Sequence, residues 1–180
     1  MTTIWTAGHG NRTSEEFLAL LAEGGIRRLV DVRAYPASRR HPHFAREALA
    51  ATLAASGIDY VWEGRALGGR RRPAADSPNI ALRNASFRAY ADHMATPEFR
   101  EAADRLVAAG MEQPSAIMCA ERLPWQCHRY LVSDYLVARS VHVLHLVNPG
   151  VVKEHRLNAI ARRSGDGLLY DRDTQTDLDL

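Results

Sequence analysis

The stretch that decides the fold is residues 3–33, TIWTAGHGNRTSEEFLALLAEGGIRRLVDVR. It opens with one short apolar run, TIWTAGH, and closes with another, RRLVDVR, and each has the length and composition of a buried strand. Between them Ser14 is placed to cap a helix over EEFLALLAEGG, which Gly24 and Gly25 end. A strand, a helix and a strand in this order predict two parallel strands joined by a helical crossover.

The same alternation continues along the chain. Further strands are predicted at IDYVWEG, PSAIMCA and VHVLHLV, and further helices at AREALAATLAASG, SFRAYADHM, EFREAADRLVAAG and PWQCHRYLVSDYLVARS. VVKEHRLNAIARR is expected to form a closing helix, and residues 64–85 a long surface loop rich in Gly, Pro and Arg. We predict an α/β fold with one domain over residues 1–165, followed by an acidic tail over 166–180. Its core is a mainly parallel central sheet of about five strands with helices on both faces.

Composition places the chain among ordinary globular proteins. Of its 180 residues, 46% are apolar and 24% are charged, which suits one domain with a hydrophobic core. No apolar run reaches the ~18 residues of a membrane span, and the N-terminus lacks the features of a signal peptide. Two cysteines in such a chain favour the reducing cytoplasm, where thiols stay free unless they do chemistry. We expect a cytoplasmic protein with no membrane partner, and the oligomeric state is left open.

Almost every cation of the chain is an arginine, because Lys153 is the only lysine. Residues 1–90 hold 13 arginines against 8 acidic residues, with clusters in SRRHPHF and GRALGGRRRP. Guanidinium groups bind phosphates and carboxylates through two parallel hydrogen bonds. These loops therefore predict a small anionic ligand or a nucleotide as partner, with nucleic acid as a second possibility. Solvated basic loops without a ligand are the structural alternative.

Polar residues follow the predicted strands at the edge where parallel sheets bind ligands. The stretch MCAERLPWQCHR, residues 118–129, holds both cysteines of the chain. Cys119 at a strand end is the expected nucleophile, Glu121 the expected general acid or base, and His9 the alternative base. These three are the predicted catalytic residues. The predicted substrate-binding residues are Asp31, Arg33, Arg122, Arg129, Asn11, Arg39 and Arg40.

The second cysteine is expected to behave differently from the first. Pro124 is well placed to begin a helix, which puts Cys127 in the first turn, where the helix dipole favours a thiolate. Cys127 and Arg129 are two positions apart, roughly 200° around a helix of ~3.6 residues per turn. If Arg129 faces the rim, Cys127 faces the sheet. We therefore predict that Cys119 is the functional cysteine and Cys127 the packing one, although both can also be buried, inert thiols.

Several blocks of the sequence resemble one known family. The blocks are TAGHGNRTSEEFLALLAEGGIRRLVDVRAYPASRRHPHF, GIDYVWEGRALGG and MCAERLPWQCHR, and they are similar to the family catalogued as domain of unknown function 488. The likeness runs from about Ile4 to Val147. At residues 8–11 this chain has GHGN where relatives usually show GHSN. The resemblance implies an α/β fold and a shared set of polar motifs, but no established reaction.

Familiar catalytic and metal motifs narrow the choice further. Trp125 stands where a phosphatase loop begun at Cys119 needs an arginine, and the chain has no C-x-x-C, G-x-x-x-x-G-K-[ST] or G-x-G-x-x-G. Cys119, Cys127 or His128, and His9 are ligand types for zinc or iron, but their spacing matches no compact zinc motif. No cofactor is therefore predicted and no residue is named as a metal ligand, while zinc or iron stays open as an alternative.

The best-supported function is a cytosolic enzyme with a cysteine-centred site, acting on a small anionic or nucleotide-like substrate held by arginines. Such an enzyme would be a thiol-dependent transferase or hydrolase. Rhodanese-like sulfurtransferases offer an analogy at the level of the fold only. The alternative is a non-catalytic module that binds nucleic acid or nucleotides through the Arg-rich loops. Its affinity would fall steeply with salt, because phosphate contacts release counterions.

Overall fold

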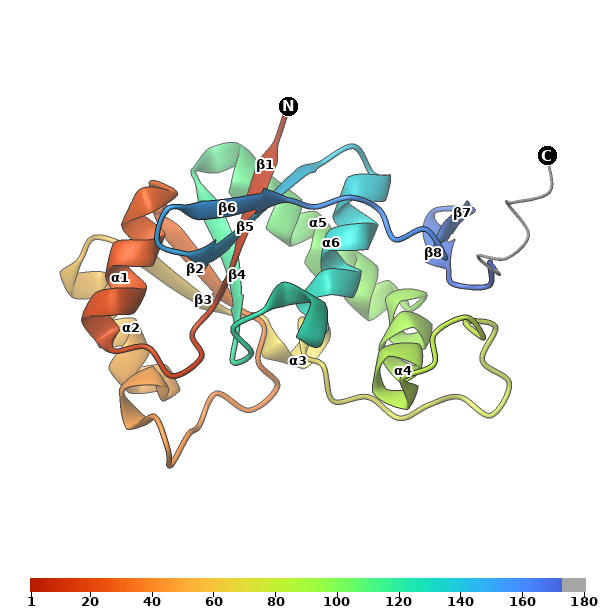
Figure 1. The fold of residues 1–180 in the computed structure, drawn as a ribbon, viewed down its shortest axis with the longest axis horizontal. Coiled ribbons are helices and arrows are strands. Elements are labelled where there is room, and N and C mark those ends of the chain that lie inside the picture. Colours follow the sequence, from red (N-terminus) through yellow and green to blue (C-terminus); the bar gives the residue numbers. More distant parts are fainter. Residues whose placement is uncertain (173–180) are drawn as a thin grey trace.

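A six-stranded sheet forms the centre of the computed structural model, which describes residues 1–172 (Figure 1). Its strand order is β3-β2-β4-β1-β5-β6, and the five predicted strands run parallel to one another. They are β1 (Thr3–Gly8), β2 (Arg28–Asp31), β3 (Asp59–Trp62), β4 (Ser115–Cys119) and β5 (His142–Asn148). The predicted α/β fold with a mainly parallel sheet is confirmed. A sixth strand, β6 (Val151–Glu154), adds an antiparallel edge.

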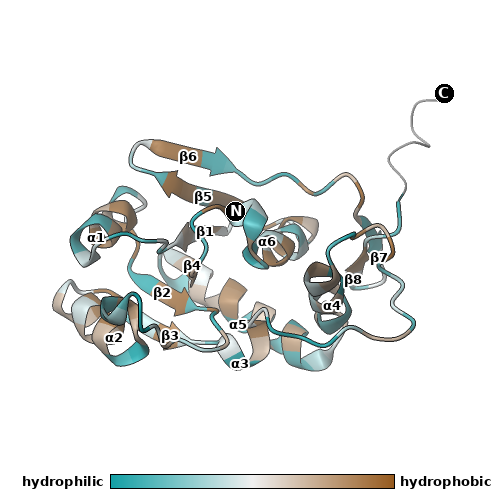
Figure 2. Cartoon of the chain, turned by 60° about the horizontal axis from the view of Figure 1, so that its bottom comes forward, coloured by the Kyte–Doolittle hydropathy of each residue, from teal (hydrophilic) through white to brown (hydrophobic). Residues whose placement is uncertain are grey.

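Helices cover both faces of this sheet (Figure 2). One face carries α1 (Ser14–Glu23) and α2 (Arg46–Ala55), and the other carries α5 (Pro97–Glu112) and α6 (Arg129–Ala138). Two apolar clusters fill the layers: one includes Phe17, Leu20, Leu49 and Leu53, and the other includes Phe99, Leu106, Leu131 and Tyr135. The short α3 (Gly64–Leu67) and α4 (Ala85–Met94) extend the second layer. Among the described residues, no helix is both long enough and apolar enough to cross a membrane.

The order of the strands creates a crevice at the centre of the sheet. β1 and β4 are neighbours, but the chain leaves β1 through α1 towards β2 and leaves β4 through α6 towards β5. The two connections therefore depart in opposite directions and on opposite faces. In open α/β sheets ligands bind outside the carboxyl ends of strands at this kind of switch point. The ends of β1 and β4 are thus the place to look for a site.

Local structure departs from the sequence predictions at helix starts and near the C-terminus. α1 is capped by Thr13 instead of Ser14, through a capping box with Glu16. The helix predicted from Pro124 is wrong at its start, because residues Pro124–Gln126 form a 3-10 turn and α6 begins only at Arg129. Residues 64–85 are mainly loop, as predicted, apart from α3.

The predicted closing helix at VVKEHRLNAIARR is also wrong. Gly150 takes a left-handed conformation (φ 70°), which turns the chain back along β5, and the two valines after it start strand β6. The chain then forms a hairpin of β7 (Arg162–Ser164) and β8 (Gly167–Leu169). Residues 166–172 of the predicted tail therefore belong to the folded part. Residues 173–180 of that prediction lie outside the described residues.

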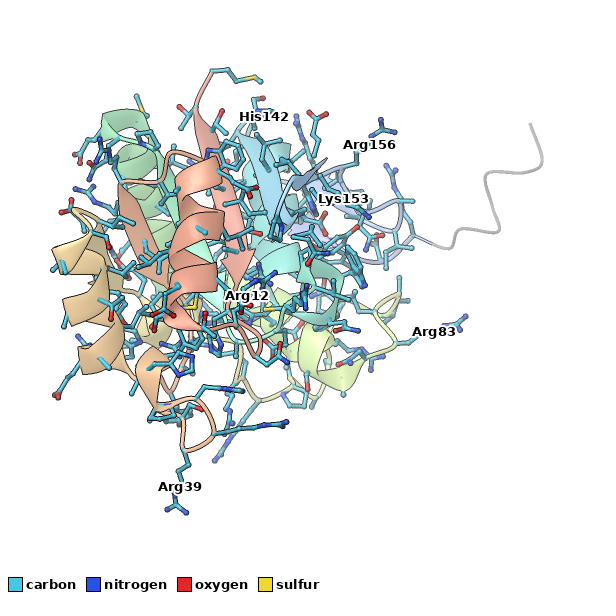
Figure 3. All side chains as sticks on the ribbon, turned by 60° about the vertical axis from the view of Figure 1, so that its left-hand side comes forward. Arg12, Arg39, Arg83, His142, Lys153 and Arg156 are labelled. Atoms are coloured by element: carbon cyan, nitrogen blue, oxygen red, sulfur yellow. The ribbon has the colours of Figure 1, made fainter. Side chains whose placement is uncertain are left out.

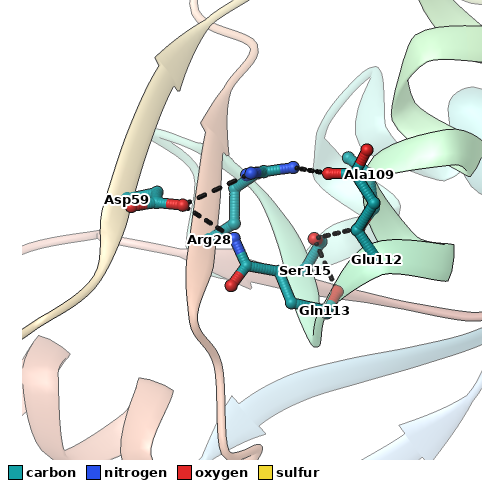
Figure 4. A network of polar contacts seen from close by, with 6 residues as sticks. All are labelled: Arg28, Asp59, Ala109, Glu112, Gln113 and Ser115. Carbon is teal, nitrogen blue, oxygen red and sulfur yellow. Dashed lines mark hydrogen bonds and ion pairs between the residues drawn. The ribbon is translucent and has the colours of Figure 1, made fainter.

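Surface ion pairs close the amino ends of the strands (Figure 4). Arg28 on β2 contacts Asp59 on β3 at 3.3 Å and Glu112 on α5 at 2.8 Å. Gln113 donates a further hydrogen bond to Asp59, while Ser115 bonds the backbone of the α5 end. Because both carboxylates are exposed, each pair contributes little to stability, about 0–1 kcal/mol. These contacts join the amino ends of β2, β3 and β4 to the end of α5, at the edge of the sheet opposite the crevice.

A buried chain of hydrogen bonds ties the C-terminal hairpin to the centre of the sheet. The Tyr170 hydroxyl donates to Asp134 at 2.9 Å, and Asp134 accepts from His155 Nε2 at 2.8 Å. His155 Nδ1 lies 2.9 Å from His145 Nε2, and His145 Nδ1 lies 2.8 Å from Thr6 Oγ1. One set of protons satisfies every link: His155 donates to Asp134, His145 donates to His155, and Thr6 donates to His145.

His145, within this chain of hydrogen bonds, makes the stability of the protein depend on pH. Burial, together with the neighbouring His155 and Arg129, lowers the pKa of His145 to about 3. Below its ordinary value of 6.5, the unfolded chain binds a proton that folded His145 refuses, so the free energy of unfolding falls as pH drops from 6.5 towards 3. His145→Gln should reduce that dependence by up to about 1.4 kcal/mol per pH unit. Urea unfolding at several pH values measures it, and an unchanged slope would contradict the assignment.

Candidate functional site

Two thiols and one imidazole meet at the crevice. Cys119 is the last residue of β4, Cys127 follows the 3-10 turn, and His128 is the N-cap of α6. Their ligating atoms all lie within 4.8 Å of one another, with His128 Nδ1 3.6 Å from Cys127 Sγ and 3.9 Å from Cys119 Sγ. The residues are 5%, 2% and 9% exposed, in the order Cys119, Cys127, His128, and neither cysteine is in a disulfide. We call this group the Cys–Cys–His centre.

The loop between the two cysteines curls tightly over the end of β1. His9 N and Gly10 N bond the carbonyls of Cys119 and Ala120, which prolongs the β1–β4 pairing beyond both strands. Gly8 permits this approach, because a Cβ at that position would lie 1.9 Å from the Glu121 carbonyl oxygen. Any side chain at position 8 would push the loop away. The close packing of the loop against Gly8 therefore fixes the path of residues 120–126, which returns Cys127 to the side of Cys119.

Arg129 fastens the returning loop from beneath. Its guanidinium donates to Thr6 Oγ1 on β1 at 3.1 Å and to the Glu121 carbonyl at 2.6 Å, and the residue is only 1% exposed. The backbone N–H of Arg129 also points at Cys127 Sγ, at 3.4 Å. Arg129 therefore positions the centre. It does not reach into the crevice as a substrate-binding residue.

The two thiols have opposite acidities. The hydrogen bond to Cys127, then burial and the negative charges of Cys127 and Glu121, raise the pKa of Cys119 well above its ordinary value. Burial also raises the pKa of Cys127, but hydrogen bonds from Cys119 and His128 and the charges of His128 and Arg129 outweigh it, so this pKa lies well below its ordinary value. The centre therefore favours ionisation of Cys127 over ionisation of Cys119. Glu121 Oε2 lies 3.1 Å from Cys119 Sγ, so the one thiol proton of Cys119 has two competing acceptors, Glu121 and Cys127.

A second charged group, Arg33, forms one wall beside the centre. Asp31 grips it with two hydrogen bonds, to Nε at 2.9 Å and to Nη2 at 2.7 Å, and is itself fully buried. The Tyr60 hydroxyl donates to the same carboxylate at 2.6 Å. A guanidinium held this way is fixed in direction before any ligand arrives. Asp31 therefore orients Arg33 and is not exposed to a ligand.

Two adjoining cavities open at this rim. The first, which we call the thiol pocket, has a volume of about 390 Å³ and is lined by the Cys–Cys–His centre together with Arg33, Tyr35, Gly69, Arg70, Asn84, Ser86, Phe87, Glu121 and Gln126. The second, the basic groove, has a volume of about 650 Å³ and is lined by His9, Asn11, Ser38, Arg40, His41 and Arg122 among others. Arg33, Tyr35, Arg70 and Glu121 border both. A ligand could span the two.

Most of the predicted residues gather here, but four do not play the predicted part. Asp31 is buried behind Arg33. Arg129 lies beneath the site, as described above. Arg39 projects away from the molecule at the tip of its loop (Figure 3). His9 borders the basic groove, where its ring stacks on Phe44 at 4.3 Å and its Nε2 lies 3.4 Å from Arg33. Burial lowers the pKa of His9 to about 4, so it is neutral near pH 7.

Sequence reasoning misjudged Cys127 and overlooked His128 as the imidazole of the site. The prediction that Cys127 faces away from the rim is wrong, because both sulfurs line the thiol pocket. That prediction placed Cys127 in the first turn of a helix, but Cys127 is extended (φ −134°, ψ 150°) and precedes the helix. Adjacent residues outside a helix can converge. The signal was present in the sequence as a histidine directly after the second cysteine, and Arg70 was visible in the Arg-rich loop.

The fold and the site define a single-domain α/β protein with a thiol–imidazole centre at the switch point of its sheet. A family model described as domain of unknown function DUF488 matches residues 13–136, and the chain belongs to this family. The matched segment contains the whole Cys–Cys–His centre as well as Arg33 and Arg70. No curated protein and no solved structure matches the chain.

The acidity of the two thiols predicts how each should alkylate. In Cys119→Ser the serine hydroxyl can still donate to the Cys127 sulfur, and His128 and Arg129 still lower the Cys127 pKa. Iodoacetamide should therefore modify Cys127 at a rate that changes little between about pH 8 and about pH 6. A model thiol with pKa ~8.5 slows almost tenfold per pH unit below that value. In Cys127→Ser, the remaining Cys119 should react slowly throughout. Peptide mass spectrometry measures both rates, and a tenfold decline per pH unit for Cys127 would contradict the assignment.

Proposed function

We propose that this protein is an enzyme whose Cys127 thiolate attacks a small anionic substrate held beside the Cys–Cys–His centre by arginines. The observation that carries the proposal is the convergence of two cysteines and an imidazole in one pocket with a fixed guanidinium, and the lowered pKa of Cys127 supports it. Activated nucleophiles, acid–base groups and anion-binding groups are the parts that covalent catalysis needs within reach of each other. The free thiols fit a reducing cytoplasm.

The roles of the two cysteines are exchanged relative to the sequence prediction. Cys127 is the nucleophile, because its sulfur carries the negative charge and receives the Arg129 N–H. Its attack forms a bond from Sγ to the electrophilic atom of the substrate, and the leaving group departs with the electron pair of the broken bond. Cys119 or His128 supplies the proton that the leaving group needs. Transfer of the bound group to a second acceptor gives a transferase, and transfer to water gives a hydrolase.

The pocket suits a small anion. Its volume, about 390 Å³, lies in the range of small-molecule sites. Arg33 is pre-oriented by Asp31, and Arg70 packs over the Tyr35 ring at 5.2 Å, so both cations are held at the mouth. Because Asp31 already neutralises Arg33, the less committed charge at the border of both cavities is Arg70. We assign Arg70 the main part in attracting the anion.

The nucleic-acid alternative receives less support from the Arg-rich loop. Arg71 uses its guanidinium to bond the carbonyls of Gly68 and Arg65, and Arg88 bonds the carbonyl of Leu82. These side chains hold the loop against the body of the protein. A surface that binds nucleic acid by its phosphates needs arginines that point outward in a row. We therefore favour the enzyme.

Reagents that differ in charge test the anion pocket. In the Cys119→Ser variant, Cys127 should react faster with the anion iodoacetate, relative to neutral iodoacetamide, than a model thiol does. Arg70→Ala should lower this rate ratio several-fold, and the effect should shrink as salt rises, because the charge is screened. Arg83→Ala is the matched control, since the Arg83 side chain projects outward from the molecule (Figure 3) and does not line the pocket. A ratio that Arg70→Ala leaves unchanged would exclude the pocket as an anion site.

A further inference from the structure

We propose that the Cys–Cys–His centre is also a binding site for a thiophilic divalent cation, with Zn²⁺ as the expected ion. Cys119 Sγ, Cys127 Sγ and His128 Nδ1 would supply three ligands, and the fourth position would face the thiol pocket. This inference does not rest on the proposed reaction, since it requires only the placement of these three atoms. The two uses exclude each other at any moment, because a bound ion occupies both sulfurs.

The spacing of the three atoms fits a tetrahedral ion. With Zn–S bonds of about 2.3 Å and Zn–N bonds of about 2.0–2.1 Å, tetrahedral geometry places sulfur and nitrogen roughly 3.6 Å apart. The two sulfur–nitrogen separations in the structure are 3.6 Å and 3.9 Å. The two sulfurs lie within 4.8 Å of each other, against roughly 3.8 Å between two sulfurs on a tetrahedral zinc ion, so binding would draw them together by up to about 1 Å. Two thiolates and an imidazole are soft and borderline ligands, which select zinc over magnesium or calcium.

The surroundings of His128 give an independent reason to expect a metal ion. Among residues 1–172, neither of its ring nitrogens has an oxygen partner. The other buried histidines each contact an oxygen through a ring nitrogen: they are His9, His93, His145 and His155. In His128, Nε2 is buried with no partner, and Nδ1 has only the long contacts to the two sulfurs. A buried imidazole that turns Nδ1 to two sulfurs and to no oxygen presents the donor set that a soft divalent cation prefers.

Gly69 keeps the approach to that imidazole clear. A Cβ at position 69 would lie 2.6 Å from His128 Nδ1, so any other residue would crowd the nitrogen that faces the sulfurs. Around the centre, the Arg129 backbone N–H already bonds Cys127 Sγ, as groups around a metal thiolate do. The Glu121 carboxylate, 3.1 Å from Cys119 Sγ, lies close enough to serve as the fourth ligand or to hold a water there.

Cobalt substitution tests the site directly. Co²⁺ added to the reduced, metal-free full chain should bind one per chain, with a thiolate-to-cobalt charge-transfer band and the intense visible bands of a tetrahedral ion. Zn²⁺ should displace it, and binding should release the proton held by Cys119. Cys119→Ser and Cys127→Ser should each weaken the charge-transfer band by about half. Each of these two variants, and the single variant His128→Asn, should lower the affinity for Co²⁺ at least tenfold. His142→Asn, at the half-buried start of β5, is the matched control.

A second measurement needs no variant. Saturating Zn²⁺ should protect both cysteines of the wild-type chain from iodoacetamide and should raise its melting temperature. Absence of the charge-transfer band in the wild type, or a full band in Cys127→Ser, would overturn the inference. These readouts report metal binding alone. Failure here would leave the proposed thiolate chemistry to be judged by the alkylation rates of the metal-free protein.

Discussion

The buried guanidinium of Arg129 is the group on which the rest of the site depends. It joins β1, through Thr6, to the loop after β4, through the Glu121 carbonyl, and its own helix α6 begins directly after the Cys–Cys–His centre. Arginine stays charged in proteins, and burying a charge is costly unless an opposite charge compensates it. Within residues 1–172, no carboxylate forms an ion pair with Arg129. Arg129 helps to lower the pKa of Cys127, and a thiolate at Cys127 would offset the buried guanidinium.

The hydrogen-bond chain behind Thr6 serves the same arrangement. Thr6 donates its proton to His145, so its oxygen lone pairs remain available to accept from Arg129. His145 is held in this state by His155, and His155 by Asp134, which also receives the Tyr170 hydroxyl. The C-terminal hairpin thereby acts on the centre across the sheet. Protonation of His145 at Nδ1 would reverse its hydrogen bond with Thr6 and place a second cation near Arg129, and burial, His155 and Arg129 together disfavour it.

The sequence predicts well what depends on strand ends and poorly what depends on how a loop returns. Parallel strands carry their last residues to one edge, so Cys119, Glu121 and Arg33 could be placed at the rim from periodicity alone. Cys127 could not, because Pro124 is as suitable for a 3-10 turn as for an α-helix, and the two place Cys127 differently.

The direction of side chains was the other feature that the sequence did not predict. Asp31 and Arg129 follow the predicted positions along the chain, but their side chains turn beneath the rim to position the residues that line it. Sequence gives the location of an arginine and does not give the partner that its guanidinium reaches. The closing helix failed for a local reason, since Gly150 permits the left-handed turn that starts β6.

Charge balance connects the proposed thiolate chemistry of the Cys–Cys–His centre with the proposed binding of a metal ion there. In the metal-free form one thiolate offsets Arg129, while Asp31 offsets Arg33, so the buried groups are nearly neutral together. Zn²⁺ with two thiolates and a neutral imidazole carries no net charge, which would leave Arg129 uncompensated. An anion in the fourth position restores the balance, and Glu121 is the nearest carboxylate to the centre that the contacts reveal. The metal-loaded centre therefore demands a negatively charged fourth ligand, either Glu121 or an anion that enters past Arg33 and Arg70.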